Sequence, residues 1–295
     1  MTVASVIRSL RVRATPLVLS GVLTGISSAR MRGDVEWSAA VFFALTAVFL
    51  QFVSNLSNEL GDSLHGTDRA DREGMRYSLQ SGELTEKDIK RLIAGCIALS
   101  CAFGLMMIRC AFGTLFCLKS AVFIALGALA VIAAMRYTLG RNPYGYRGLG
   151  DIYVFLFFGL ATVCGGCYLC SGGERILDAV LPACAIGCFS VGVLNVNNIR
   201  DMKADAATRV TMAIRLGEKG ARVYQTVLIA LGWICLLCES ALDGGTVWSY
   251  AYVLSAPLFA KHLATVWTKS GSGLDKMVPM LSISTFILSI LRLIG

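Results

Sequence analysis

WSAAVFFALTAVFLQFVSNLSNELGD, residues 37–62, joins an apolar run directly to a group of asparagines and carboxylates. A helix needs about 20 apolar residues to cross a bilayer, and this run is long enough to do so. The last turns of such a helix lie at the membrane boundary, where water and charged substrates reach them. The stretch therefore predicts a transmembrane helix that ends in a functional site.

The composition of the whole chain is that of a membrane protein. Of 295 residues, 56% are hydrophobic and only 16% are charged, and the mean hydropathy is +0.67, which leaves no room for a large soluble domain. We expect an all-α, polytopic membrane helical bundle of about nine transmembrane helices, one domain over residues 1–295. The apolar runs are continuous rather than alternating, which favours helices over a strand barrel. The nine runs are about residues 14–30, 37–57, 92–108, 112–135, 152–169, 176–196, 223–238, 246–263 and 277–291.

The charge is unevenly distributed between the two ends of these helices. The chain carries 27 Lys and Arg against 19 Asp and Glu, a net charge of +8 that is compatible with nucleic acid, a membrane surface or anionic substrates as partners. With nine spans, 21 of the 27 basic residues and 13 of the 19 acidic residues fall on the side of the N-terminus. The positive-inside rule makes that side cytoplasmic and the C-terminal side external. Membrane lipid and anionic substrates, not nucleic acid, are the expected partners.

Two connections on the cytoplasmic side, residues 58–91 and 197–222, are longer and more polar than a turn requires. If the preceding helices persist, each presents amides and carboxylates on one helix face, at spacings i, i+3 or i+4, and i+7. On the first, these are Asn55, Asn58 or Glu59, and Asp62. On the second, these are Asn198, Asp201 and Asp205. The matching spacing predicts the same geometry at both sites.

Carboxylates gathered at a membrane boundary repel one another unless a cation binds them. Hard oxygen ligands without His or Cys favour Mg²⁺, which keeps several waters and is completed by substrate phosphates. Bases suited to phosphate oxygens lie among the acids. They are Arg69, Arg72, Arg76, Lys203, Arg209 and Arg215. The combination predicts a magnesium–diphosphate site; the alternative is a set of solvated loop charges that obey the positive-inside rule.

The motifs resemble those of the UbiA superfamily of intramembrane aromatic prenyltransferases. The family pattern N-L-x-N-D-x-x-D-x-x-x-G-x-D stands as Asn55, Leu56, Asn58, Glu59, Asp62, Gly66 and Asp68. The pattern N-N-x-R-D-x-x-x-D stands as Asn197, Asn198, Arg200, Asp201 and Asp205, followed by RLG at 215–217. RYTLGRNPYGYRGLGDIYVFLFFG (136–159) and RVRATP (11–16) are also similar to family segments. The departures are Glu59 for the usual Asp, Thr208–Arg209 for Gly-Lys, and Asn142 for Lys.

The resemblance implies a chemistry, and within the family it is closest to the naphthoate branch of menaquinone biosynthesis. It implies Mg²⁺-dependent transfer of a polyprenyl group from polyprenyl diphosphate to 1,4-dihydroxy-2-naphthoate, with loss of diphosphate and CO₂ to give demethylmenaquinol, in the cytoplasmic (inner) membrane of a bacterium. The implied metal ligands are Asn58, Glu59, Asp62, Asn198, Asp201 and Asp205. The implied substrate-binding residues are Asn55, Asp68, Arg72, Arg141, Tyr146, Asp151, Lys203, Arg209 and Arg215. The implied catalytic residues are Asp62, Asp201, Asp205, Arg141 and Tyr137, the last able to offer a π-face to an allylic cation.

Several alternatives stay open at this point. A sister enzyme of the family would use 4-hydroxybenzoate, homogentisate or haem as the acceptor, and a cation-coupled transporter would use the acids for transport. The tyrosines also suit an interfacial aromatic belt. Arg11 or Arg13 either binds the acceptor carboxylate or only marks topology, and Asp151 either orients a substrate hydroxyl or binds a neighbouring Arg.

Overall fold

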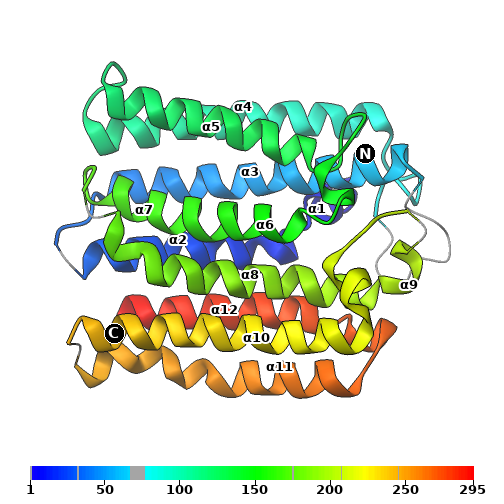
Figure 1. The fold of residues 1–295 in the computed structure, drawn as a ribbon. Coiled ribbons are helices and arrows are strands. Elements are labelled where there is room, and N and C mark those ends of the chain that lie inside the picture. The colour runs from blue at the N-terminus through cyan, green and yellow to red at the C-terminus, as the bar shows by residue number, and fades with distance from the viewer. Residues whose placement is uncertain (1, 32, 67–76, 175, 207, 245) are drawn as a thin grey trace.

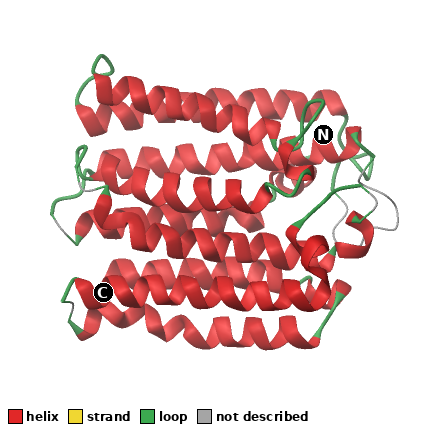
Figure 2. Cartoon of the chain, in the orientation of Figure 1, coloured by secondary structure: helices red, strands yellow, loops and turns green. Residues whose placement is uncertain are grey.

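The chain folds as a bundle of long helices that lie side by side (Figure 1). The structure, a computed structural model, describes residues 2–31, 33–66, 77–174, 176–206, 208–244 and 246–295. Within these residues the regular structure is helical, apart from one isolated bridge between Arg147 and Val210 (Figure 2). The all-α prediction is therefore confirmed.

In the described part of the chain, the helices form nine long rods and several short segments. The rods are α2 (Thr15–Arg30), α3 (Trp37–Leu64), α4 (Glu86–Phe112), α5 (Leu118–Arg136), α6 (Gly150–Val154) with the π-helix η3 (Phe155–Ala161) and α7 (Thr162–Cys170), η4 (Leu177–Ala179) with α8 (Val180–Arg200), α10 (Met212–Leu242), η5 (Val247–Ser255) with α11 (Ala256–Thr268), and η6 (Gly271–Leu274) with α12 (Met277–Ile294). The short segments are α1 (Val3–Leu10), η1 (Val12–Ala14), η2 (Tyr144–Tyr146) and α9 (Met202–Asp205).

Seven helical segments in the described part of the chain are long and apolar enough to cross a membrane. They are Trp37–Leu64, Glu86–Phe112, Leu118–Arg136, Gly150–Cys170, Leu177–Arg200, Met212–Leu242 and Gly271–Ile294. Of the nine predicted segments, the first becomes α2, with only 16 residues, and the eighth becomes η5 and α11, which carry Lys261 and His262. Both lie in the same bundle as the seven (Figure 1).

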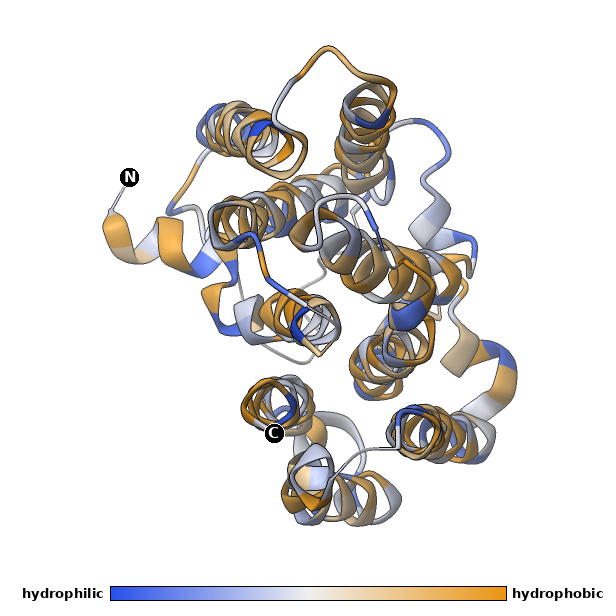
Figure 3. Ribbon diagram, turned by 90° about the vertical axis from the view of Figure 1, so that its left-hand side faces the viewer, coloured by the Kyte–Doolittle hydropathy of each residue, from blue (hydrophilic) through white to orange (hydrophobic). Residues whose placement is uncertain are grey.

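The helix α8 forms the centre of the bundle, and α5 lies at its edge. In the most apolar 18-residue window, 72% of the α8 segment is buried but only 6% of α5. Most of the ribbon of the outer helices carries the colour of hydrophobic residues (Figure 3), and apolar side chains such as Leu126, Leu129 and Ile132 of α5 are exposed, as expected of a protein surrounded by lipid. Two glycines bring α8 against η3, because a Cβ at Gly159 would lie 2.7 Å from both the Ala183 carbonyl oxygen and the Gly187 Cα.

Both predicted motifs lie at the end of the bundle that holds α1 and α9, on the right in Figure 1. The first prediction of helix continuation is right, because α3 runs to Leu64 and carries Asn55–Asp62 on helical turns. The second is wrong in detail. Helix α8 ends at Arg200, Asp201 takes a non-helical backbone (φ −91°, ψ 5°), and Asp205 belongs to the separate α9. Equal spacing in the sequence therefore does not give equal geometry.

Candidate active site

A cavity of about 210 Å³ opens where α2, α3, η3 and α8 approach one another at the motif end of the bundle. Polar side chains of α3 and α8 and apolar side chains of α2 and η3 line it. The polar lining includes Gln51, Asn55, Asn58, Asp62, Ser190, Asn197 and Asn198, with Arg11, Tyr137, Thr138, Asp151, Arg209 and Thr211. The apolar lining includes Leu17, Val154, Phe158, Val193 and Leu194.

Arg209 lines this cavity and joins the two motifs. Its Nη2 lies 3.5 Å from Asp62 Oδ1, and its Nε lies 3.2 Å from Asp205 Oδ1. Both aspartates are buried, with 5% and 1% of their surface exposed. Two carboxylates distant in the sequence thus share one cation, and this arrangement offsets the repulsion between them.

Tyr146 supports the same cluster from a third segment. Its Oη donates a 2.7 Å hydrogen bond to Asp62 Oδ1, and the Arg209 guanidinium lies 5.2 Å from the centre of its ring. Its carbonyl oxygen accepts a hydrogen bond from the Val210 N–H at 3.0 Å. His65 packs edge-on against the tyrosine ring. The 141–149 loop is therefore fastened to the loop that carries Arg209.

The predicted asparagines also reach the cavity. Asn58 and Asn198 both line it, and Asn58 Oδ1 accepts a hydrogen bond from Thr138 Oγ1 at 3.2 Å. Asn55 donates through Nδ2 to the Leu10 carbonyl oxygen at 2.9 Å, which ties the end of α1 to α3.

Two predicted metal ligands have other partners. Arg200 binds the Asp201 carboxylate with two hydrogen bonds, from Nε at 2.7 Å and from Nη2 at 2.8 Å. Glu59 Oε1 accepts hydrogen bonds from the Leu79 N–H at 2.7 Å and from Ser9 Oγ at 3.2 Å. Neither carboxylate is part of the cavity lining.

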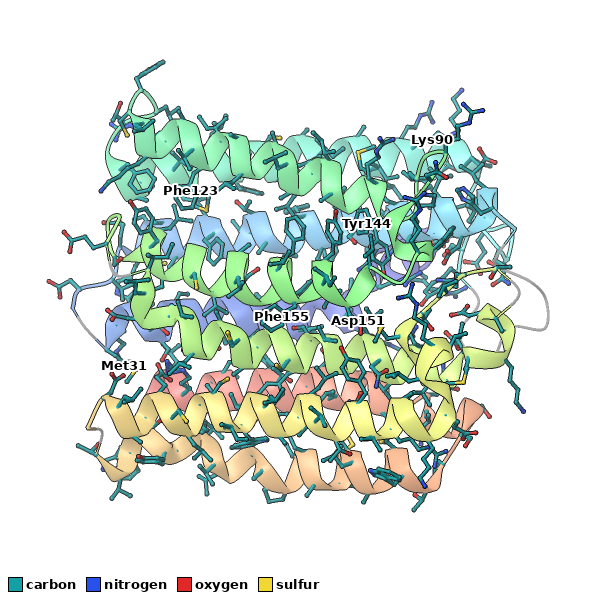
Figure 4. All side chains as sticks on the ribbon, in the orientation of Figure 1. Met31, Lys90, Phe123, Tyr144, Asp151 and Phe155 are labelled. Atoms are coloured by element: carbon teal, nitrogen blue, oxygen red, sulfur yellow. The ribbon has the colours of Figure 1, made fainter. Side chains whose placement is uncertain are left out.

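Tyr137 and Asp151 lie on the cavity wall. Burial raises the pKa of the Tyr137 phenol to about 12, so the group is neutral at physiological pH. Asp151 accepts a 3.0 Å hydrogen bond from the hydroxyl of Tyr224, a partner that is neither of the two the sequence suggested. Tyr144 stacks on Tyr153 and donates to the Ala133 carbonyl oxygen instead of lining the cavity. Figure 4 shows Asp151 and Tyr144 toward the motif end.

The other predicted substrate-binding residues are outside the cavity lining. Arg141, on a loop, Lys203, in α9, and Arg215, in the first turn of α10, are all exposed. Arg215 donates to the Arg147 carbonyl oxygen at 3.2 Å. Asp68 and Arg72 lie outside the described residues.

Gln51 and Ser190 are cavity residues that the sequence motifs did not suggest. Gln51 is 7% exposed and Ser190 1%, and neither Gln51 Oε1 nor Ser190 Oγ has a hydrogen-bond partner among the described residues. A buried acceptor without a partner is costly, so both atoms point to a ligand that pairs with them. The signal for Gln51 is an amide within an apolar span. Ser190 carries no such signal, because serines are common in membrane helices.

Comparison with known proteins agrees with this geometry. The UbiA prenyltransferase family matches residues 18–287. A 1,4-dihydroxy-2-naphthoate octaprenyltransferase of Escherichia coli is 37% identical over 257 residues, covering 87% of this chain and 82% of that protein. The protein of the same name from Haemophilus influenzae is 34% identical over 289 residues, covering 97% of this chain and 93% of that one.

The fold has a counterpart among solved structures. An apo structure of a UbiA homolog from Aeropyrum pernix superposes with a TM-score of 0.71 at 18% identity, covering 94% of this chain and 96% of that chain. At that identity the likeness concerns the fold alone. The match to the family model over most of the chain and the identity to the Escherichia coli protein confirm the resemblance in the motifs: the chain belongs to the UbiA prenyltransferase family.

Proposed function

We propose that this chain transfers a polyprenyl group from polyprenyl diphosphate to 1,4-dihydroxy-2-naphthoate, releasing diphosphate and CO₂ and giving demethylmenaquinol. The observation that carries the proposal is the convergence of Asp62 and Asp205 on Arg209, which lines a cavity that apolar side chains also line. The relatives named 1,4-dihydroxy-2-naphthoate octaprenyltransferase support the choice of acceptor.

The donor set suits Mg²⁺. Asp62 and Asp205 provide hard carboxylate oxygens, Asn58 and Asn198 provide amide oxygens on opposite helices, and Arg209 already occupies a place where these oxygens attract positive charge. Mg²⁺ needs only one or two carboxylates when waters and substrate phosphates complete its shell. We assign the metal to these four residues. When bound, the ion would neutralise the charge that develops on the leaving diphosphate.

The protein's own groups would bind and orient the donor. Arg209 would turn from the aspartates toward the diphosphate oxygens, to which a guanidinium donates in bidentate fashion. Tyr146 would keep Asp62 in place through its hydroxyl. The neutral ring of Tyr137 on the cavity wall would stabilise positive charge on the allylic carbon, and the apolar walls formed by Phe158 and Leu17 would keep water from it.

The acceptor would lie deeper in the same cavity. Gln51 Oε1 and Ser190 Oγ are both available there, and a ring hydroxyl of the acceptor would donate to the first of them. The electron-rich ring would then form the new C–C bond as the C–O bond to diphosphate breaks, and CO₂ would leave as the ring regains aromaticity.

The charge distribution supports a proposal for how this site lies in the membrane. We propose nine spans, with α2 and the η5–α11 rod added to the seven, in the cytoplasmic membrane of a bacterium. The N-terminus and both motifs would face the cytoplasm, where the soluble aromatic acid and the diphosphate headgroup are accessible.

The test uses the purified full chain in lipid nanodiscs with a labelled polyprenyl diphosphate and each aromatic acceptor in turn. We expect Mg²⁺-dependent prenylation and CO₂ release with 1,4-dihydroxy-2-naphthoate. Asp62→Asn and Asp205→Asn should each lower kcat/KM for the donor at least about a hundredfold, which corresponds to about 2.7 kcal/mol. Full activity of either variant at limiting Mg²⁺ would contradict the metal assignment. Prenylation of 4-hydroxybenzoate instead would move the chain to a sister activity.

A further inference from the structure

Glu59 lies to one side of the α3 face that lines the cavity and is not part of the lining. An α-helix turns by about 100° per residue, so Gln51, Asn55, Asn58 and Asp62 fall within an arc of about 60°. Glu59 lies about 40° beyond the edge of this arc, on the side that packs against α1. The residue is 0% exposed. Burial of a carboxylate is costly unless groups of the protein pair with it, so the partners of Glu59 indicate its role.

Two hydrogen-bond donors to Glu59 within the described residues belong to different segments, which the carboxylate holds together. Ser9 lies in α1, and Leu79 lies in the segment that follows the first motif loop; both donate to Oε1. The two segments also bind each other, because Ser78 Oγ donates to the Ser5 carbonyl oxygen at 2.7 Å. Glu59 therefore fixes the C-terminal turn of α1 against the segment that begins at Tyr77.

Arg11 follows directly after this turn and reaches the cavity. Its guanidinium lies 3.9 Å from the centre of the Tyr77 ring, and its Nε is buried without a hydrogen-bond partner among the described residues. Its φ of 52° makes Arg11 the one non-glycine residue in the described part of the chain with a left-handed backbone. Such a conformation is unfavourable for an arginine and persists only where its surroundings enforce it.

From this geometry we infer that Glu59 is a positioning residue: it holds the end of α1 so that Arg11 faces the cavity and binds an oxyanion of a substrate. Glu59 is then not a metal ligand. The inference rests on the proposed function for the identity of the substrates, whose oxyanions are the donor diphosphate and the acceptor carboxylate. The additional methylene of Glu59, relative to the aspartate usual in the family motif, gives its carboxylate the reach to the Leu79 N–H.

Binding is measured without turnover, so that the result does not depend on the proposed activity. Isothermal titration of the full chain in nanodiscs uses two probes, inorganic pyrophosphate with Mg²⁺ and 1,4-dihydroxy-2-naphthoate. The variants are Glu59→Ala, Glu59→Gln, Arg11→Ala and the double variant Glu59→Ala/Arg11→Ala. Glu83→Gln is the matched control, because Glu83 pairs with Arg8 of α1 at 2.6 Å on the half-exposed surface.

We expect Glu59→Ala and Arg11→Ala each to lower the affinity for the same probe about tenfold. Arg11→Ala removes the charge-assisted contact itself, and Glu59→Ala removes the hydrogen bonds that hold Arg11 in position. The double variant should be no weaker than Arg11→Ala alone, because the two residues act as a unit. Glu59→Gln should bind that probe within about threefold of the wild type, since its amide oxygen still accepts from the Leu79 N–H. The affected probe identifies the oxyanion as diphosphate or carboxylate.

Three results would overturn the inference. One is a Glu59→Gln variant that needs about tenfold more Mg²⁺ for half-maximal pyrophosphate binding, as a direct ligand would. Another is additive loss in the double variant, and the third is an Arg11→Ala variant that binds both probes normally. If Glu59→Ala does not fold, Ser9→Ala removes only one donor to the carboxylate and should weaken the same probe about threefold. Absence of prenylation by the wild type would refute the proposed function and leave these binding comparisons intact.

Discussion

Arg209 is the residue on which the site depends most. Its planar guanidinium reaches Asp62 and Asp205 through two different nitrogens, a geometry that the single ammonium of a lysine does not provide. Both aspartates are buried, so removal of the cation that they share weakens the compensation of their charge.

Arg209→Ala should therefore destabilise the protein and make its stability depend on Mg²⁺. We expect Tm in nanodiscs to fall in the variant, and a saturating concentration of Mg²⁺ to raise Tm more in the variant than in the wild type. KM for the polyprenyl diphosphate should rise at least about tenfold. Thermal denaturation with and without Mg²⁺ and steady-state kinetics measure both effects.

Two variants control this experiment. Arg215→Ala removes an exposed arginine from a neighbouring segment and should leave the Mg²⁺-dependent rise in Tm unchanged. Arg209→Lys should lie between Arg209→Ala and the wild type in KM. An equal Mg²⁺ response in Arg209→Ala and the wild type would show that Arg209 and the metal do not share the aspartates.

At this scale the sequence predicted the residue types but not their pairing. The motifs named Asp62, Asp205 and Arg209, but no spacing rule indicates that one guanidinium lies between carboxylates from two distant helices. Glu59 and Asp201 matched the motif spacing equally well, yet both carboxylates bind protein partners that lie off the cavity. Side-chain direction depends on neighbours from elsewhere in the chain, here Leu79 for Glu59.

At the scale of elements, hydropathy located every rod of the bundle, whereas helix ends depended on local chemistry. Helix α3 continued past its apolar run because its amides and carboxylates pair with neighbours such as Thr138 and Tyr146. Helix α8 stopped at Arg200, where Asp201 binds the arginine beside it. The π-helix η3 had no distinct pattern, since an insertion of this kind is a property of packing.

The contact between η3 and α8 gives a prediction for a single methyl group. In Gly159→Ala the new Cβ would meet the Ala183 carbonyl oxygen and Gly187 Cα at 2.7 Å, and neither backbone atom can move freely. We expect a loss of about 1–3 kcal/mol and a Tm lower by about 2–6 °C. Gly165→Ala in α7 is the matched control, because no atom lies within 4 Å of its added Cβ. A Tm equal to that of Gly165→Ala would contradict the tight contact.

At the scale of the whole molecule, the count and direction of spans depend on α2 and the η5–α11 rod. Figure 1 places the N- and C-termini at opposite ends of the bundle, as an odd number of passes requires. If the chain makes nine passes, the charge counts predict that the N-terminus lies inside.

Reporter fusions measure this topology directly. Alkaline phosphatase fused after Gly295 should be active, because this enzyme folds on the external side of the membrane. Green fluorescent protein fused at the same place should be dark, because it becomes fluorescent only on the cytoplasmic side. Green fluorescent protein fused before Met1 should fluoresce. A fluorescent C-terminal fusion would mean an even number of spans and would exclude nine.

The contrast between α5 and α8 has a consequence for biogenesis. The α5 segment has the highest mean hydropathy of the seven, 2.2, and almost no buried surface. It can therefore insert stably into lipid without contacts to later helices. The α8 segment is synthesised later and carries Asn195, whose amide donates to the Ala221 carbonyl oxygen and to Gln225 of α10, residues that do not yet exist at that moment. The first half of the bundle can therefore settle in the bilayer one helix at a time. The half that completes the site must wait for α10 before its polar face is satisfied.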